Sequence, residues 1–189
     1  TNSSLGSNQV MITGLSNTGS TSLNTFVNGA HNSTTDSSGV LISGTKNTVT
    51  GTTKRSVIFG MQNTELAGTG NLVMGYLNQT SNGENSIIGG TLNVSSNDTS
   101  TMTMGQSNNL TLNTNSFIVG KSNKLHTNHE LTVLGKLHDV SGTSITSLVT
   151  GENIYANNVR NVILSGKAHR IFGSQAIASF GKDNIVNTT

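Results

Sequence analysis

One short unit recurs along the whole chain: two or three apolar residues, a glycine, and an asparagine three residues later. Residues 56–63, SVIFGMQN, show it in full. The glycine returns every 15 residues, with two steps of 16, at positions 14, 29, 44, 60, 75, 90, 105, 120, 135, 151, 166 and 181. A fixed period in this range is the mark of a repeat architecture. We therefore expect residues 1–189 to form a single elongated domain of about twelve coils.

The residues around each glycine follow a strict pattern. Of the 36 positions that lie one to three residues before a glycine, 27 are apolar, against 32% of the whole chain. Asparagine stands three residues after the glycine in nine of the twelve copies, and Asn2 fits one further copy. The exceptions are His138, Ile154 and His169. Only 10% of the chain is charged, but this regular apolar register distinguishes it from a disordered polar sequence.

Short runs of Val, Ile, Leu and Phe bounded by glycine and asparagine predict strands rather than helices. A 15-residue coil holds two such strands and two tight bends, and the second strand is centred five residues after the glycine, as at Leu110 and Leu125. Stacked coils place equivalent strands in parallel register, about 4.8 Å apart. The asparagines then form a ladder, amide to amide along the stack. The predicted fold is an all-β parallel solenoid.

The strand that contains the glycine is apolar on both faces. Side chains alternate across a strand, so the positions three and one before the glycine share a face, and the position two before it points the other way. The position three before is apolar in eleven of twelve copies, and the position two before in ten. A two-stranded coil covers only one face with its own chain. We therefore expect the second face to be buried against another copy, in a homo-oligomer.

Composition and period exclude several other classes. The chain has no cysteine and thus no disulfide framework, and its net charge of +2 is too small to indicate nucleic-acid binding. A 15-residue period does not fit three hexapeptides per coil, and four aspartates are too few for calcium-binding nonapeptide repeats. We find no run of 18 apolar residues and no signal-peptide pattern, so any export signal or membrane anchor is expected outside this chain.

The repeat resembles the head repeats of the YadA-like trimeric autotransporter adhesins, whose typical element reads S-V-A-I-G. Residues 56–60, SVIFG, and 86–90, SIIGG, are close to it, and the resemblance covers essentially the whole chain. It implies a left-handed parallel β-roll with three chains around one axis. The implied location is the surface of a Gram-negative bacterium, anchored in the outer membrane by a region absent here, so we expect the chain to be an excised head.

The resemblance also implies a function. The head would bind a host receptor or an extracellular-matrix protein, and some members of the family bind host adhesion molecules with immunoglobulin-like domains. Three identical faces on one axis raise avidity without new contacts. The alternative is a structural spacer or fibre segment that has no ligand of its own.

Catalysis has little support in the sequence. The eight carboxylates are scattered, and none has a close partner at the same position of a coil, as a glycosidase pair requires. His126 and His129 lie in an expected bend, and His138 and His169 lie two coils apart. We interpret the histidines as solvated or ladder-filling rather than as metal ligands. The chain is expected to have no enzyme activity, no cofactor and no metal.

An apolar group just past the glycine is the first candidate for ligand binding. It spans three adjacent coils and comprises Met61, Tyr76, Leu77 and Leu92. If exposed, these side chains form a stripe of the kind that anchors protein recognition. Alternatively, they pack against the adjoining subunit.

A basic group at the same position of later coils is the second candidate. It comprises Lys121, Lys136, Lys167 and Lys182, with Glu152 between them. Such a ridge suits sialylated or sulfated glycans or an acidic receptor face. The alternative is a role in solubility and in protecting exposed strand edges.

The two 16-residue steps each insert one residue, within Thr50–Arg55 and within Ser141–Thr146. Insertions in a solenoid map to loops on one face, often the binding face. The alternative is that these insertions are bulges that bind no partner.

Overall fold

The computed structural model describes residues 1–136, 139–152, 154–157, 160–161, 163–168, 170–173, 175–183 and 185–187. Side chains are described for all of these except 140–147, 149, 164, 186 and 187. His138 and His169, where the sequence interrupts the asparagine pattern, lie outside the described residues. Within the described part we find no helix that is long and apolar enough to span a membrane.

Two series of strands alternate along the chain. The glycine strands are β2 (Asn8–Leu15), β4 (Leu23–Ala30), β6 (Leu41–Thr45), β8 (Val57–Met61), β10 (Leu72–Tyr76), β12 (Ile87–Thr91), β14 (Met102–Gln106) and β16 (Phe117–Lys121). The short strands are β1 (Ser3–Leu5), β3 (Thr18–Ser20), β5 (Ser33–Thr35), β7 (Thr48–Thr50), β9 (Thr64–Leu66), β11 (Gln79–Ser81), β13 (Val94–Ser96) and β15 (Asn109–Thr111).

The C-terminal coils have longer and shorter strands. β17 (Lys124–Lys136) and β18 (Asp139–Thr150) each run through a short-strand and a glycine-strand position. They are followed by β19 (Tyr155–Asn157), β20 (Ile163–Leu164), β21 (Arg170–Phe172), β22 (Ala178–Ser179) and β23 (Ile185–Asn187). The regular rod therefore holds about ten coils, from β2 to β18, and the last glycine positions keep only the two-residue strands β20 and β22.

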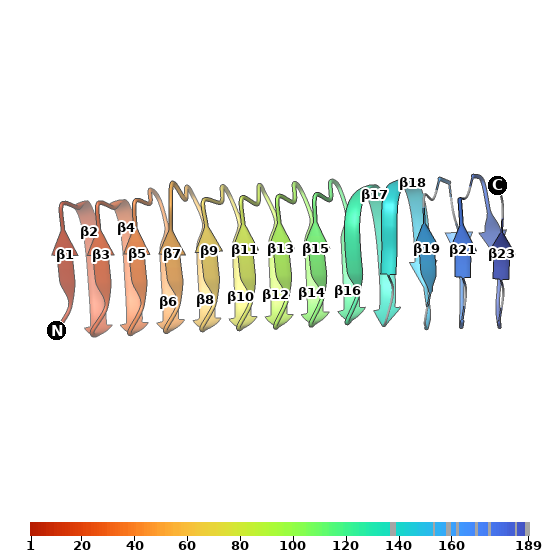
Figure 1. Cartoon of the computed structure of the whole chain (residues 1–189). Helices are drawn as coiled ribbons and strands as arrows, with labels where there is room; N and C mark the ends of the chain where they lie inside the picture. Colours follow the sequence, from red (N-terminus) through yellow and green to blue (C-terminus); the bar gives the residue numbers. More distant parts are fainter. Residues whose placement is uncertain are drawn as a thin grey trace.

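Each strand pairs in parallel with the equivalent strand one coil away, so the protein is a parallel β-solenoid (Figure 1). Leu72 pairs with Ile87, a step of 15 residues. In Figure 1 the short strands lie in front and run upward, the glycine strands lie behind and run downward, and the chain advances from left to right. The coil is therefore left-handed.

The two inserted residues fall where the 16-residue steps predict them. Thr34 pairs with Val49, a step of 15, whereas Ser38 bridges to Lys54, a step of 16. The first extra residue thus lies between Val49 and Lys54. The second lies at the register shift between β17 and β18, in 141–144.

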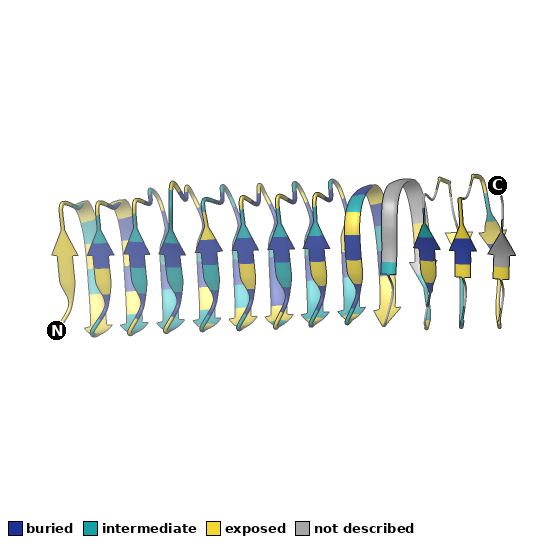
Figure 2. Ribbon diagram, viewed as in Figure 1, coloured by how far each residue is buried: buried dark blue, intermediate teal, exposed yellow. Residues whose placement is uncertain are grey.

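Buried residues recur at the same positions of successive coils (Figure 2), and they are only partly apolar. Most buried apolar side chains stand two residues before the glycine or five after it, and include Val27, Ile42, Ile58, Val73, Ile88, Leu110, Ile118, Leu125 and Val133; Val40, Leu131 and Ile154 are buried at other positions. They form two clusters, separated where Ser95 and Thr103 occupy the interior positions. Buried Ser, Thr and Asn side chains fill the rest. Along the glycine strand, side chains alternate between the interior and the outer face of the coil, as predicted.

The predicted asparagine ladder is confirmed from Asn2 to Asn123. At Asn78, the backbone N–H donates to Asn63 Oδ1 at 3.0 Å, and Nδ2 donates to the carbonyl oxygen of Gly90 at 2.9 Å. The Asn78 Oδ1 in turn accepts the backbone N–H of Asn93 at 3.0 Å. Each amide therefore satisfies buried polar groups of the coils on both sides, which removes a desolvation penalty from the interior.

Close approach of adjacent coils explains the glycine. Gly75 has a φ of +113°, and a Cβ built on it would lie 2.0 Å from the carbonyl oxygen of Gly90. The same oxygen accepts the Asn78 amide. Glycine and asparagine are thus two parts of one contact: the glycine lets the next carbonyl approach, and the asparagine supplies that carbonyl with a donor.

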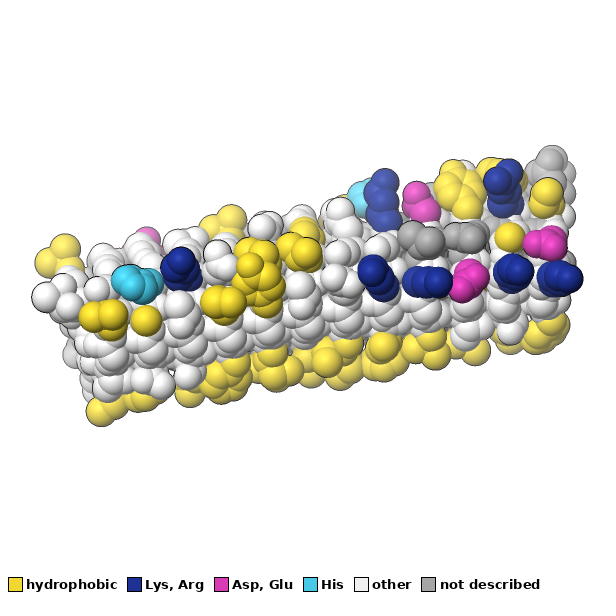
Figure 3. All heavy atoms as spheres, turned by 90° about the horizontal axis from the view of Figure 1, so that it is seen from below, with side chains coloured by type: hydrophobic (Ala, Val, Ile, Leu, Met, Phe, Trp, Pro, Cys, Tyr) yellow, Lys and Arg dark blue, Asp and Glu magenta, His cyan; other side chains and the backbone are white. Residues whose placement is uncertain are grey.

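The second apolar face of the glycine strands points outward. These side chains form what we call the apolar band: Met11, Phe26, Leu41, Val57, Phe59, Leu72, Met74, Ile87, Met102, Met104, Phe117, Val119, Leu134, Leu148 and Ile163. Phe59 and Phe117 are 41% and 40% exposed in the single chain. Figure 3 shows apolar side chains along one edge of the rod over its whole length. An exposed apolar surface of this extent is unusual for a monomer.

Replacing Gly75 with alanine tests the contact between coils. We expect Gly75→Ala to lower the free energy of unfolding by about 3 kcal/mol, because the new Cβ overlaps a backbone oxygen and the backbone is left-handed. Thermal and urea unfolding followed by circular dichroism measure this. Gly166→Ala is the matched control, since among the described residues other than its chain neighbours no atom lies within 4 Å of its Cβ position. Equal stability of the two variants would contradict this account of the glycine.

Candidate functional site

The bend that follows the glycine strand carries both predicted groups. Residues one position after the glycine are register partners, so Met61 pairs with Tyr76, and Lys121 with Gln106 and Lys136. The structure therefore places the apolar and the basic group in one row along the rod. Figure 3 shows this row, apolar near the middle and basic toward the C-terminal end.

The apolar group, which we call the mid-rod patch, consists of Met61, Tyr76, Leu77 and Leu92. Met61, Tyr76 and Leu92 are 44%, 38% and 45% exposed, and Leu77 is half-buried. The patch lies at a bend, whereas the apolar band lies on the outer face of the glycine strands. The single chain therefore presents two separate apolar surfaces.

Backbone geometry holds the patch outward. Leu77 and Leu92 have φ values of +54° and +58°, a conformation that costs an L-residue about 1–2 kcal/mol. Their N–H groups donate to the carbonyl oxygens of Met61 at 3.1 Å and Tyr76 at 2.9 Å. The same conformation recurs at the equivalent Ser16, His31, Lys46, Gln62, Ser107 and Ser122. Because it recurs, this backbone strain belongs to the coil and is not a mark of a binding site.

The basic group is exposed throughout. Lys121, Lys136, Lys167 and Lys182 all lie at the surface. Lys136 Nζ contacts Glu152 Oε1 at 3.1 Å, and both side chains are about half exposed. A solvent-exposed pair of this kind adds little stability, at most about 1 kcal/mol. Its main effect is to offset one positive charge in the row.

Two buried carboxyls in the middle coils are features that the sequence reasoning missed. Glu65 is fully buried at the position five after the glycine. Its Oε1 accepts from Ser56 Oγ at 2.8 Å and from Asn71 Nδ2 at 2.9 Å, while Oε2 has no partner within the described part of the chain. Gly68 makes room, since a Cβ there would lie 2.2 Å from Oε1. Burial raises the pKa of Glu65 despite these hydrogen bonds.

Asp98 is the second buried carboxyl. Its Oδ1 accepts the backbone N–H of Asn113 at 2.7 Å, and its Oδ2 accepts from Ser95 Oγ at 2.6 Å. Burial is again the largest effect and raises the pKa of Asp98. The repeat register itself held the signal for Glu65, because five residues after the glycine is an inward position.

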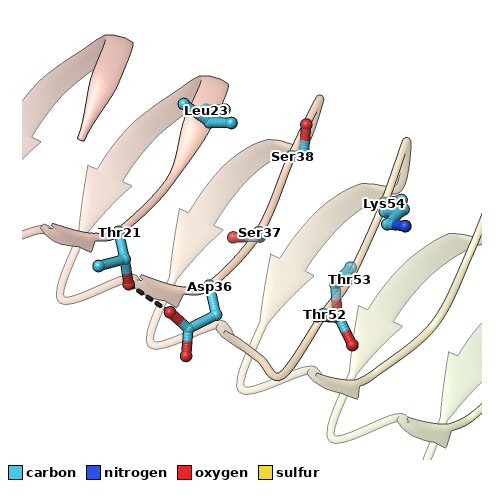
Figure 4. Close-up of a pocket in the computed structure, with 8 residues that line it drawn as sticks. All are labelled: Thr21, Leu23, Asp36, Ser37, Ser38, Thr52, Thr53 and Lys54. Atoms are coloured by element: carbon cyan, nitrogen blue, oxygen red, sulfur yellow. Dashed lines mark hydrogen bonds between the residues drawn. The ribbon is translucent and has the colours of Figure 1, made fainter. Parts of the chain in front are cut away.

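A shallow groove lies at the first inserted residue (Figure 4). The hydroxyl of Thr21 donates to the carboxylate of Asp36 across two adjacent coils, and Lys54 borders the groove on the far side. Ser37 and Thr53 are buried and belong to the interior. Thr52, Thr53 and Lys54 of its lining belong to the insertion predicted within Thr50–Arg55, whereas none of the predicted apolar or basic candidates lines it. Its exposed groups offer one carboxylate, one ammonium and hydroxyls, which suits weak polar contacts.

Within the described residues, no three His, Cys, Asp or Glu side chains gather as a metal-binding group. His126 and His129 are exposed in β17. They lie at the predicted bend, since Thr127 and Glu130 have φ values of +55° and +52°, like the equivalent bend residues Leu112 and Asn115, while the strand pairing of β17 continues through it.

Comparison with known proteins gives little further information. No family model matches the chain, and no curated relative matches it. Among solved structures, a protein of Desulfovibrio desulfuricans G20 assigned as an acetyltransferase is 8% identical, with a TM-score of 0.23, over 98% of this chain and 68% of its own. The polySia-specific acetyltransferase NeuO is 11% identical, with a TM-score of 0.20, over 96% and 81%. The polysialic acid O-acetyltransferase OatWY is 10% identical, with a TM-score of 0.13, over 100% and 85%.

The buried Glu65 makes stability depend on pH. The pKa of Glu65 in the folded state lies above its ordinary value of 4.5. The contribution of Glu65 to the free energy of unfolding is therefore most favourable below pH 4.5, and it is lost as the pH rises through the folded-state pKa. We expect Glu65→Gln to be more stable than the parent at pH 7.5, with a difference that shrinks toward pH 4.5. Melting temperatures across this range measure it.

Glu84→Gln removes an exposed carboxylate and is the control. If Glu65→Gln and Glu84→Gln change the pH profile equally, burial of Glu65 does not cause the effect.

Proposed function

We propose that this chain is the binding head of a bacterial surface adhesin. It would act as a rigid homotrimeric rod that presents equivalent surfaces to a host receptor or matrix protein, without catalysis. The likeness of its repeats to YadA-like heads and its left-handed parallel solenoid support the proposal. The observation that carries it is the mid-rod patch, three exposed apolar side chains on consecutive coils at a bend.

The apolar band supports the homotrimer. It runs along the outer face of the glycine strands, where the chain itself supplies no cover, and its phenylalanine, leucine and methionine side chains would gain from burial. Each square ångström of apolar surface removed from water contributes roughly 25 cal/mol. The nearly continuous apolar sequence of the glycine strands is also typical of strands that are covered on both faces. Three copies around one axis would bury all three bands together.

The mid-rod patch supports a protein ligand. Recognition surfaces are commonly anchored by aromatic and large apolar side chains surrounded by polar residues. Tyr76 adds a hydroxyl to an apolar ring, a combination enriched at interfaces. Thr91 and Gln106 continue the row beyond the patch and give it a polar border. An immunoglobulin-like adhesion molecule or a matrix protein would suit such a surface.

The basic row is a second candidate contact. Lys121 and Lys136 are register partners, so two like charges stand side by side. Such an arrangement is unfavourable in the free protein and is relieved by an acidic partner surface. The lysines would therefore add an electrostatic contribution to the same receptor contact.

The oligomer is tested by solution mass. Light scattering should give a mass near three times 19.6 kDa for the parent chain. Leu72→Asp places a charge in the apolar band and should yield monomers. Gln79→Asp adds the same charge to the opposite outer face of that coil and should leave the trimer intact. A monomeric parent chain would refute the burial of the band by other copies.

Ligand binding by the mid-rod patch is tested with Tyr76→Ser. The parent chain is screened against collagen, fibronectin, laminin and immunoglobulin-like host receptors, and by attachment of host cells to the immobilised protein. Tyr76→Ser should weaken the binding found by at least about tenfold, the effect of a central interface residue. Gln79→Ser, on the outer face of the short strand of the same coil, should not. Unchanged attachment of Tyr76→Ser would favour the spacer alternative.

A further inference from the structure

The outer face of the short strands carries a second group of chemically distinctive residues near the C-terminal end. Four of them are successive register partners, one per coil: Lys124, Asp139, Tyr155 and Arg170. This face lies on the side of the coil opposite the apolar band. It would therefore remain accessible if the band is covered by other copies.

An exposed aromatic pair occupies this face. The rings of Tyr155 and Phe172 have centroids 5.6 Å apart and are tilted by 57°, and the side chains are 37% and 39% exposed. Arg170 stands two residues before Phe172 in β21, so both project from the same face of the strand. The chain has only seven aromatic residues, two Tyr and five Phe. Two of them lie here beside an exposed guanidinium.

A hollow adjoins the aromatic pair on the preceding coils. It is lined by Asn109, Thr111, Lys124, Leu125, His126 and Asp139. Lys124 and Asp139 are register partners. The Lys124 side chain is exposed, and the Asp139 side chain is half-buried. The hollow offers an ammonium, a carboxylate, an amide and a hydroxyl in one place.

The charge distribution favours an anionic ligand at this end. Residues 121–189 contain seven basic and four acidic side chains, whereas residues 1–120 contain three basic and four acidic. The formal excess of three positive charges would attract anions toward the C-terminal coils.

We propose that this face binds an acidic oligosaccharide, a sugar chain that bears carboxylates, laid along the axis of the rod. The apolar face of a pyranose ring would pack on the Tyr155–Phe172 pair, as aromatic side chains provide rigid apolar area. Arg170 would bind a sugar carboxylate through paired N–H donors. Asp139 would accept hydrogen bonds from sugar hydroxyls in the hollow, and the side-chain amide of Asn109 would donate hydrogen bonds to them.

An acidic peptide fits this face less well. A peptide is usually held by apolar pockets for its side chains or by an open sheet edge. The hollow is lined mainly by polar side chains, and the short strands are paired on both sides. The oligosaccharide site requires neither the trimer nor the mid-rod patch, so it extends the proposed function and can be tested separately.

Tyrosine fluorescence provides the test, because the chain has two tyrosines and no tryptophan. A Tyr76→Phe background leaves Tyr155 as the sole reporter. This protein is titrated with a hyaluronan decasaccharide, which carries carboxylates but no sulfate. A chitin hexasaccharide tests a neutral sugar, dextran sulfate tests charge alone, and polyglutamate tests an acidic peptide. We expect hyaluronan to change the Tyr155 emission at concentrations where the chitin oligomer and polyglutamate do not.

Two variants in the reporter background locate the site. Arg170→Gln should weaken hyaluronan binding by about tenfold, the effect of losing a charge-assisted hydrogen bond. Tyr155→Leu, followed by calorimetry, should weaken it similarly. Arg160→Gln removes the same charge from an exposed position outside the aromatic pair and the hollow, and should change the affinity less than twofold. Circular dichroism confirms that the variants remain folded.

Three results would overturn the proposal. The first is no binding of hyaluronan, whether or not dextran sulfate binds. The second is equal weakening by Arg160→Gln and Arg170→Gln, which would indicate nonspecific charge attraction. The third is polyglutamate binding as tightly as hyaluronan, which would indicate an acidic peptide site. None of these results bears on the receptor screen, so failure of this proposal and failure of the adhesin proposal are distinguishable.

Discussion

The structure depends on one contact between neighbouring coils. In it, the carbonyl oxygen of one glycine lies close to the glycine of the preceding coil, where a Cβ would leave no room, and a buried asparagine donates a hydrogen bond to that oxygen. Gly75, Gly90 and Asn78 show it: a Cβ added to Gly75 would lie only 2.0 Å from the Gly90 carbonyl oxygen, and Asn78 donates to that oxygen at 2.9 Å. A buried carbonyl without a donor would cost about 1–3 kcal/mol. Repeating the contact every 15 or 16 residues sets the register of the stack from Gly14 to Gly135.

A stack held by this contact has a narrow interior in which polar groups are paired along the axis. The interior can therefore accept carboxyls such as Glu65 and Asp98, provided that neighbouring side chains supply donors and a glycine such as Gly68 supplies space. These groups are linked to stability through their raised pKa values. They are enclosed within the coil, so ligand binding has to use the outer surface.

The outer surface is organised in rows, because each position of the repeat returns at the same place one coil further on. Three rows differ in chemistry: the apolar band on the glycine strands, the mid-rod patch and lysines at the bend, and the charged and aromatic residues on the short strands. We propose a different partner for each row, namely another copy, a protein receptor and an acidic sugar. A rigid rod can keep three such contacts apart without any moving part.

The sequence by itself determined the period, the strands, the inward asparagines, the two insertions and the double apolarity of the glycine strand, because each follows from a local spacing that repeats along the chain. It also identified the mid-rod patch and the lysines by their position. Only the tertiary structure decided that the patch and the lysines are exposed, that Asp98 is buried, and that Tyr155 meets Phe172 beside Arg170. Those features depend on which side chains of different coils approach one another, and spacing within one coil does not specify that.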